Sequence, residues 1–401
     1  MSILKQASLL MIPSGYKEEK LYSINPVDGS GDLSFARSSV GTRVNSDGFI
    51  ETVPLNLLTY SELFFNTSWS KLRSTITPNA ATSPIGDLTA SELDIGANGY
   101  LYKIGVSVVP NTEYTLSFYI QDINSANNTL AIYDESNASF ISIDIPYSVT
   151  NQWTRVTHTF TTPTGCTSAR PYIQRGVAGS GSVYIWGAQL NAGSTAKTYF
   201  PTTDRLNYPR IDYTGGGCGK LLIEPQSTNS FNYSENFAAN WTVYATASAS
   251  DNQGISPDGA NNATLLTKNN IFARIDKSLS LPSSTYTYSI FAKKGITDWI
   301  VLRVDGSIGF SFVSFDLGNG VVGNDQNIVS KSIEDYGNGW YRCSMTMTTT
   351  ITVARCYVRN DGNYPTSNAV TADAYLWGAT MEAIEIPTSY IPTSGTTATR
   401  T

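Results

Sequence analysis

The stretch Tyr184-Ile185-Trp186-Gly187-Ala188 returns later in the chain as Tyr375-Leu376-Trp377-Gly378-Ala379, and this repetition decides the fold. Two further motifs recur in the same order: Tyr60-Ser61-Glu62 as Tyr233-Ser234-Glu235, and Tyr199-Phe200-Pro201-Thr202 as Tyr390-Ile391-Pro392-Thr393. Solenoid repeats have periods of roughly 20–50 residues, far shorter than the spacing here. The sequence therefore predicts one domain that is present twice.

The distance between equivalent residues changes along the chain and locates an insertion. It is 173 residues from Tyr60 to Tyr233 but 187 from Trp153 to Trp340. Insertions collect in surface loops, because loop length costs little free energy. We therefore expect the second copy to carry a longer strand-loop-strand excursion near 300–335.

Both copies have the alternating pattern of half-buried strands. Tyr114–Ile120 and Trp153–Phe160 in the first copy, and Tyr286–Phe291 and Trp340–Met345 in the second, alternate in this way, and helical periodicity is nearly absent. Short strands bounded by Asn, Gly, Pro and Ser predict an all-β chain with two tandem antiparallel jelly-roll sandwiches.

The expected organisation has five parts. They are a β-rich leader over residues 1–55, a first module over 56–203, a β-hairpin connector over 204–228, a second module over 229–395 and a polar, frayed tail over 396–401. The leader has two interpretations, a β-extension packed on the first module or a docking peptide for a larger assembly, and its apolar patch is Leu9, Leu10, Met11 and Ile12.

Bulk composition argues against several classes of partner. Charged residues make up only 14% of the chain, and the net charge of −6 comes without a Lys or Arg cluster, so nucleic acid is a poor fit. No apolar run approaches the roughly 20 residues that a membrane helix needs, and the N-terminus has no secretory signal pattern. The chain is expected to stay in the compartment where it is made, and not to insert into a membrane.

Catalytic groups are sparse. The single histidine, His158, lies mid-strand between two threonines and is read as structural, and no nucleophile elbow accompanies it. The four cysteines, Cys166, Cys218, Cys343 and Cys356, lack metal-binding spacing and are read as small buried thiols, with a Cys343–Cys356 bridge left open. We expect no enzymatic activity, although two carboxylates would suffice for glycoside cleavage.

Aromatic residues are the best pool of ligand-binding side chains. The tryptophans that recur in both copies are interpreted as core, whereas copy-specific aromatics suit a sugar, whose C–H face packs on a ring while amides and carboxylates bind its hydroxyls. The candidate glycan contacts are Tyr100, Tyr102, Tyr133 and Tyr172 in the first copy, and Trp299, Tyr336, Tyr357, Tyr364, Asn360 and Asp361 in the second.

Several sequence segments resemble segments of bacteriophage fibre and spike proteins of the head or tail. They are Phe35–Glu51, Pro209–Cys218, Leu222–Gln226 and Thr388–Ser394. The two copies resemble the jelly-roll carbohydrate-binding modules embedded in such proteins. The chain has no long β-helical region, which favours a compact fibre or decoration protein over a tailspike.

The resemblance implies a homotrimer on the virion surface, assembled in the host cytoplasm and released by lysis. Its leader would contact other virion proteins, and its modules would attach weakly and multivalently to host-surface glycans. No cofactor is expected beyond a structural calcium ion, for which the resemblance suggests Glu235 and Glu382 as ligands, against ordinary hydrogen-bonded carboxylates. Two other functions stay open, a purely architectural virion protein and a capsular polysaccharide depolymerase.

Overall fold

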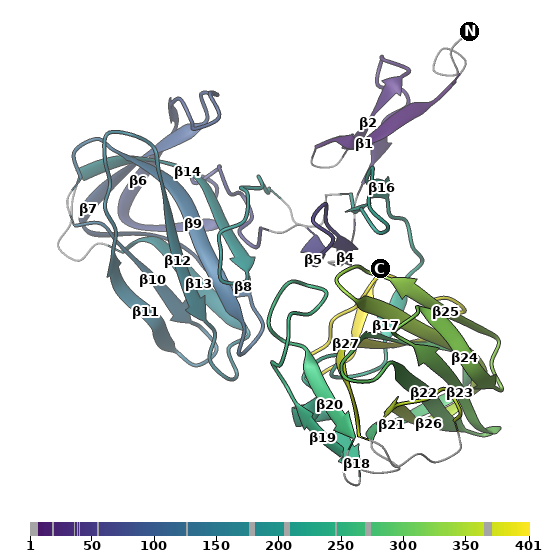
Figure 1. Ribbon diagram of the computed structural model, residues 1–401. Coiled ribbons are helices and arrows are strands. Elements are labelled where there is room, and N and C mark those ends of the chain that lie inside the picture. Colours follow the sequence, from purple (N-terminus) through teal and green to yellow (C-terminus); the bar gives the residue numbers. More distant parts are fainter. Residues whose placement is uncertain are drawn as a thin grey trace.

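The computed structural model describes residues 7–17, 20–35, 37, 39, 41–53, 56–125, 127–175, 181–203, 209–244, 247–268, 274–364 and 371–401. Nearly all regular structure in this part of the chain is antiparallel strand, and it forms two β-sandwiches that Figure 1 shows as separate bodies. The predicted all-β fold with two tandem sandwiches is confirmed. No helix in the described part is long and apolar enough to span a membrane.

Module 1 is built from nine strands. They are β6 (Trp69–Ala81), β7 (Ala90–Lys103), β8 (Val106–Ser107), β9 (Glu113–Asp122), β10 (Thr129–Asp134), β11 (Ser139–Pro146), β12 (Thr154–Thr161), β13 (Ser168–Arg175) and β14 (Gly181–Ala192). The long strands β6 and β7 run through both layers. Sheet A has the order β11-β10-β13-β7-β6, and sheet B has the order β12-β9-β14-β7-β6.

Module 2 repeats this plan with some strands fused and others split. It contains α1 (Phe237–Asn240), β18 (Thr242–Tyr244), β19 (Ala247–Ser250), β20 (Thr264–Lys268), β21 (Arg274–Lys294), β22 (Trp299–Gly306), β23 (Gly309–Asp316), β24 (Val321–Gln326), β25 (Ser330–Asp335), β26 (Trp340–Arg359) and β27 (Ala372–Glu382). Its sheet A has the order β24-β23-β22-β26-β21-β18, and its sheet B the order β25-β26-β21-β27-β20-β19.

The predicted excursion in the second copy consists of the strands β24 and β25, which pair with β23 and β26 and not with each other. In module 1, β11 is followed directly by β12, whereas in module 2 the equivalent strand β23 is followed by β24 and β25 before β26 begins at Trp340. One added strand extends sheet A and the other extends sheet B. The inserted residues therefore widen both layers at their edges without interrupting the core.

Each sandwich has its own apolar core between the two sheets. Side chains that alternate along the strands fill it, for example Leu101, Ile132 and Ile173 from sheet A of module 1 with Phe118 and Ile185 from sheet B. In module 2 the thiols of Cys343 and Cys356 belong to the core and are not bridged. Cys166 is also buried, but Cys218 is exposed, so the interpretation of all four cysteines as buried thiols is wrong at that position.

The duplicated motifs form the same buried clasp in both modules. The Tyr199 hydroxyl lies 2.7 Å from Ser61 Oγ and donates to Glu62 over 3.0 Å, and the Tyr390 hydroxyl lies 2.7 Å from Ser234 Oγ and donates to Glu235 over 2.6 Å. Gly187 and Gly378 have φ values of 62° and 61°, and each passes so close to its clasp tyrosine that a Cβ would crowd the ring.

A buried asparagine anchors each clasp. The Asn229 amide donates to the carbonyls of Ala379 and Ile391, and its oxygen accepts from Phe231 and Met381. Asn56 makes the equivalent four bonds, to the carbonyls of Ala188 and Phe200 and from the amides of Leu58 and Leu190. The repeated motifs are therefore structural.

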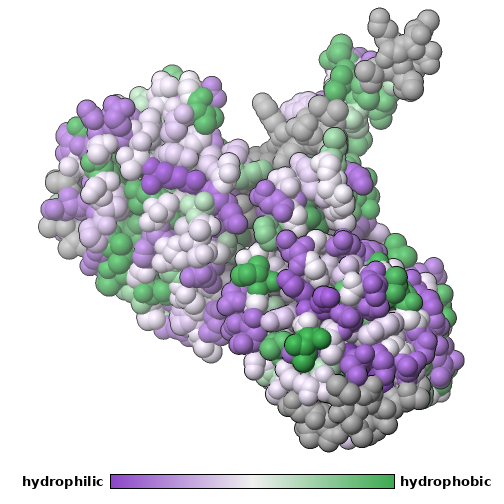
Figure 2. Space-filling model, viewed as in Figure 1, coloured by the Kyte–Doolittle hydropathy of each residue, from purple (hydrophilic) through white to green (hydrophobic). Residues whose placement is uncertain are grey.

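The leader forms two hairpin-like sheets. β1 (Leu10–Lys17), β2 (Lys20–Asn25) and β3 (Leu33–Ser34) make a small sheet that extends away from both sandwiches, and β4 (Gly41–Val44) pairs with β5 (Ile50–Val53). Figure 2 shows apolar side chains on the extending sheet, where Leu9 and Ile24 are exposed. Leu10 and Met11 are half-buried, the side chain of Ile12 lies outside the described ones, and the docking role of these residues stays a prediction.

Among the described residues, the β4–β5 hairpin packs on module 2, which corrects the interpretation of the leader as an extension packed on module 1. Val44 and Ile50 enter an apolar cluster with Phe291, Trp377 and Tyr390. The connector hairpin, β15 (Ile211–Asp212) with β16 (Lys220–Leu221), flanks β4, because Tyr213 donates to the Val44 carbonyl and Asp212 accepts from the Val44 amide.

The C-terminal segment is ordered, contrary to the expected fraying. β28 (Ala398–Arg400) pairs with β17 (Ser227–Asn229), and the buried Arg400 guanidinium donates to the Pro225 carbonyl and lies 3.2 Å from Glu224. Arg210 reaches the same carboxylate over 2.8 Å. The leader hairpin, the connector and the end of the chain thus meet at one place on module 2, which we call the hub (residues 41–53, 209–229 and 388–401).

Candidate functional site

The four tyrosines predicted for the first copy gather on one surface of module 1. Strand pairing places Tyr133 opposite Arg170, and Tyr172 opposite Tyr102, on neighbouring strands of sheet A. Their chain neighbours Leu101, Ile132 and Ile173 point into the core, so the tyrosines line the outer face. We call this surface the tyrosine platform (Tyr100, Tyr102, Tyr133, Phe140 and Tyr172).

The rings of the platform contact one another in a continuous row. The centroid of Tyr172 lies 4.9 Å from Tyr102 and 6.1 Å from Tyr100, and Tyr133 lies 4.9 Å from Phe140. These spacings are those of favourable aromatic pairs. Phe140 is exposed, and Tyr100, Tyr102 and Tyr133 are half-buried, so ring surface remains open to solvent along three strands.

The charges around the platform are paired. Arg170 lies 2.8 Å from Glu135, and its guanidinium sits over the rings of Tyr133 and Tyr102 at 5.3 and 5.5 Å. Burial opposes ionisation of Glu135, but hydrogen bonds from Ser168, the Gly105 amide and Arg170 outweigh it and lower the pKa of that carboxyl. Arg175 likewise pairs with Asp144 and lies over Phe140.

This surface can stack its rings on the flat face of a ligand and can form a few hydrogen bonds with it. Flat rings flanked by neutralised charges favour the C–H faces of uncharged sugar rings over anionic groups, which need unpaired cations. The hydroxyl groups of the tyrosines can donate and accept hydrogen bonds at the ring edges.

The equivalent surface of module 2 is closed. Strand pairing makes Arg303 the counterpart of Tyr133, Arg274 the counterpart of Tyr102, and Tyr357 the counterpart of Tyr172. Tyr364 folds back over Tyr357 with ring centroids 5.3 Å apart, and its hydroxyl accepts from Arg303 over 2.8 Å. These two tyrosines are 6% and 7% exposed, and since Tyr172 of the platform is also only 9% exposed, the open rings of module 1 are those of its other members.

The other candidates in module 2 are occupied by structural contacts, which corrects the prediction that they form an open glycan site. The Trp299 ring lies between the backbones of Gly323 and Gly362, so closely that a Cβ on either would clash. Tyr336 directly follows β25 of sheet B and packs on Phe291 at 4.9 Å. Asp361 is ion-paired with Arg359 over 3.1 Å in the loop that also holds Asn360.

The proposed calcium ligands are not brought together. Glu382 is fully buried and accepts from Ser227 over 2.7 Å and from Thr388, whereas Glu235 accepts from Tyr390 and Asn262. In the described part of the chain, the two carboxylates share no hydrogen-bond partner. Within the described ranges, no group of three or more His, Cys, Asp and Glu side chains could hold a metal ion.

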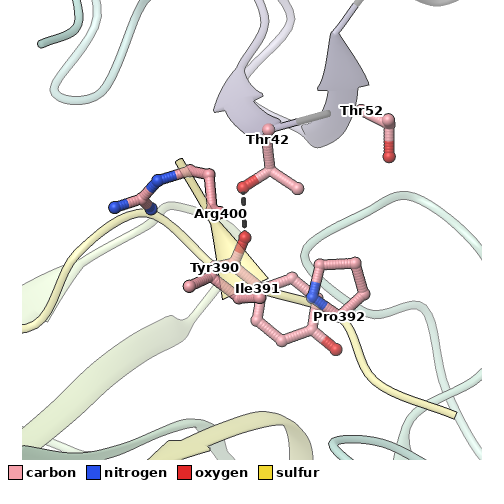
Figure 3. Close-up of a pocket in the computed structure, with 7 residues that line it drawn as sticks. Thr42, Thr52, Tyr390, Ile391, Pro392 and Arg400 are labelled. Atoms are coloured by element: carbon pink, nitrogen blue, oxygen red, sulfur yellow. Dashed lines mark hydrogen bonds between the residues drawn. The ribbon is translucent and has the colours of Figure 1, made fainter. Parts of the chain in front are cut away.

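A small pocket lies where the β4–β5 hairpin meets the C-terminal segment. Figure 3 shows Thr42 and Thr52 facing Tyr390, Ile391 and Pro392, with the Thr42 hydroxyl donating to the Tyr390 carbonyl over 2.5 Å. Arg400, which also lines the pocket, is engaged by Pro225, Ser389 and Glu224. The pocket is therefore a packing gap within the hub.

The comparison with protein families finds one match, to the model of a carbohydrate binding domain, CBM_4_9, over residues 64–181. The matched segment contains every residue of the tyrosine platform together with Arg170, Glu135 and Arg175. No curated protein matches the sequence.

Among solved structures, the chain is similar to the tandem CBM22-1–CBM22-2 domain of Paenibacillus barcinonensis Xyn10C, with 12% identity, 82% of this chain and 98% of that chain covered, and a TM-score of 0.30. It is also similar to tailspike protein 4 of bacteriophage CBA120, with 18% identity, coverage of 34% and 21%, and a TM-score of 0.29. A third similar structure is the C-terminal family 22 module of Clostridium thermocellum Xyn10B, with 12% identity, coverage of 38% and 99%, and a TM-score of 0.28. Residues 64–181 of module 1 are thus similar to a carbohydrate binding domain, and the tyrosine platform lies within this segment.

Proposed function

We propose that module 1 binds uncharged glycans on the tyrosine platform and that the chain is not an enzyme. The observation that carries the proposal is the convergence of Tyr100, Tyr102, Tyr133 and Tyr172 on one solvent-facing sheet, within the segment that matches a carbohydrate binding domain. The carboxylates beside the platform, Glu135 and Asp144, are both held in ion pairs, which favours binding over glycoside cleavage.

The binding test uses the full chain on a glycan array, followed by calorimetry with the best ligand. Tyr102→Ala and Tyr133→Ala each remove an open ring, and we expect each to weaken binding about tenfold, which corresponds to about 1.4 kcal/mol. Tyr244→Ala is the matched control, because Tyr244 is an exposed tyrosine on sheet A of module 2 and stacks with Arg274.

The results separate the alternatives. A silent array at high valency would favour a purely architectural protein. Equal losses in Tyr244→Ala and Tyr102→Ala would place the ligand elsewhere. Release of reducing sugar from host capsule would instead indicate a depolymerase.

We further propose that the chain is displayed on the surface of a phage particle, as a homotrimeric head or tail fibre or decoration subunit made in the host cytoplasm. Support comes from the sequence segments that resemble phage fibre proteins. The same segments contribute the contacts of the hub, and they are Phe35–Glu51, Pro209–Cys218, Leu222–Gln226 and Thr388–Ser394. Deletion of residues 1–30 should release the protein from particles while glycan binding persists. Light scattering of the intact chain measures the oligomeric state.

A further inference from the structure

The β4–β5 hairpin occupies a defined seat on module 2. The Ile50 amide donates to the Pro257 carbonyl over 2.8 Å, and the Phe49 ring lies against Gly259, 3.2 Å from where a Cβ would be. Val44 and Ile50, which face each other across the hairpin, pack on the outer side of sheet B against Phe291 and Trp377. The seat thus combines a turn, residues 256–260, with an aromatic sheet face.

Module 1 carries the same turn at the same place. Ser83-Pro84-Ile85-Gly86-Asp87 precedes its counterpart Ser256-Pro257-Asp258-Gly259-Ala260 by 173 residues. In both, the first residue of the turn accepts from the glycine amide at 3.0 Å and donates its own amide to the fifth residue at 2.8 or 2.9 Å. The sheet behind the turn is also equivalent, with Trp153 donating to the Thr82 carbonyl as Trp340 does to that of Ile255.

The two seats differ in what covers them. Pro257 is buried beneath the hairpin, whereas Pro84 is exposed. A Cβ on Gly86 would meet nothing within 4 Å, although the matching position on Gly259 meets Phe49. Trp340 is 3% exposed, and its counterpart Trp153 is only half-buried. Within the described part of the chain, no hydrogen bond reaches the Pro84 carbonyl.

The uncovered seat is also the more apolar one. Asp258 and Asn261 of module 2 are replaced by Ile85 and Leu88 in module 1, and these side chains are 66% and 62% exposed. Two large aliphatic side chains at the tip of an exposed turn leave apolar surface in water, which solvation alone does not favour and which marks interaction sites. They lie on the sheet B side of module 1, opposite the tyrosine platform.

We propose that the seat on module 1, formed by Ser83–Leu88 with Trp153, docks a β-hairpin of the 41–53 type supplied by a partner chain. The argument is continuity with the intramolecular interface, because the homologous seat accepts such a hairpin through a proline carbonyl, a glycine face and an aromatic sheet. The chain's own hairpin is already held by module 2 and the connector and cannot fill both seats. Ile85 and Leu88 add apolar contact that the seat on module 2 lacks.

The test uses a peptide of residues 41–53, closed by a terminal disulfide, with a photoreactive benzoylphenylalanine in place of Phe49. The peptide is irradiated with the full chain, and the cross-links are mapped by mass spectrometry. We expect saturable labelling of residues 82–90. Labelling confined to residues 254–260, or no labelling, would overturn the proposal.

Two variants make the test specific. Ile85→Arg puts a long charged side chain, found in neither seat, into an exposed turn that keeps its backbone bonds, and it should reduce labelling at least tenfold with an unchanged melting temperature. Ile296→Arg is the matched control, since Ile296 is an equally exposed isoleucine outside both seats, and it should leave labelling intact. Equal labelling of wild type and Ile85→Arg would contradict the assignment.

Discussion

Sheet A of module 1 and sheet A of module 2 share five equivalent strands in the same order, to which module 2 adds β24, yet the positions of the platform residues Tyr102 and Tyr133 hold arginines in module 2. Both retain one ion pair at the same position, Glu135 with Arg170 in module 1 and Asp305 with Arg355 in module 2. Around that pair, module 1 has tyrosines where module 2 has Arg274 and Arg303.

The arginines of module 2 need partners, and the partners close the surface. Arg355 lies between Asp276 and Asp305, Arg274 pairs with Asp276 over 2.7 Å, and Arg303 pairs with Asp305 over 2.7 Å. A ladder of this kind keeps the charges satisfied at 13–22% exposure, and it puts paired arginines where module 1 has the rings of Tyr102 and Tyr133. The difference teaches that duplication preserved the clasp of each module while its surfaces diverged.

The largest expected effect is a loss of stability on removing the buried asparagine that anchors the clasp in both modules. Asn229→Ala removes four hydrogen bonds to backbone groups in a fully buried site, and Asn56→Ala does the same in module 1. We expect each to lower the free energy of unfolding of its own module by about 3 kcal/mol or more, because unsatisfied buried groups cost roughly 1–3 kcal/mol each.

Calorimetry of the full chain checks this. Each variant should shift one unfolding transition and leave the other in place, and Asn151→Ala, at an exposed loop position, should shift neither. If either variant moved both transitions together, the modules would not be independent folding units.

A smaller effect is expected from turning one surface into the other. Tyr133→Arg places the module 2 residue beside Arg170, where Glu135 is the only carboxylate paired with that arginine. The introduced guanidinium replaces a ring that can stack on a sugar, and module 1 offers it no hydroxyl acceptor like that of Tyr364 in module 2. Glycan affinity should therefore fall at least tenfold, which corresponds to about 1.4 kcal/mol. Calorimetric titration with the array ligand measures it, and Tyr22→Arg, on the N-terminal sheet, is the control. Unchanged affinity in Tyr133→Arg would separate the platform from glycan binding.

Local pattern was sufficient to predict the strands, the duplication and the longer excursion in the second copy, and it selected the four tyrosines as candidates, whereas their convergence on one surface is a finding of the structure. Alternation along each strand determines which side chains leave the core, and that information is local. The anchoring asparagines were missed, although Asn56 and Asn229 share the 173-residue offset of the neighbouring tyrosines.

The misses have a common physical origin. Closure of module 2 depends on which arginine faces which aspartate across three strands, and the leader seat depends on contacts between residues about 200 apart, such as Ile50 with Pro257. Neither register between distant strands nor docking of a hairpin follows from the residues on one strand. The same limit applies to Tyr364, which covers Tyr357 and accepts a hydrogen bond from Arg303 on another strand.

The last prediction distinguishes the two clasps by pH. Burial, with a further contribution from the negative charge of Asp258, raises the pKa of Glu235 to about 7. The hydrogen bond that Tyr390 donates to this carboxyl lowers the pKa but does not outweigh these two effects. Burial also raises the pKa of Glu62 in module 1. A carboxyl with a raised folded-state pKa binds more protons in the folded than in the unfolded state. Its contribution to stability is therefore greatest in acid and is lost as the pH rises from about 4.5 to about 7.

Module 2 should accordingly melt at a progressively lower temperature, relative to Glu235→Gln, as the pH rises through this window. Asp258 and Glu235 both hydrogen-bond to the Asn262 amide, so ionisation of Glu235 places two negative charges around one donor, next to the turn that seats the β4–β5 hairpin. The amide of Glu235→Gln cannot ionise, and the pH dependence of the module 2 transition should flatten in that variant. The module 1 transition, followed in the same scans, is the internal reference. A pH dependence that persists unchanged in Glu235→Gln would assign it to another group and leave the two clasps electrostatically alike.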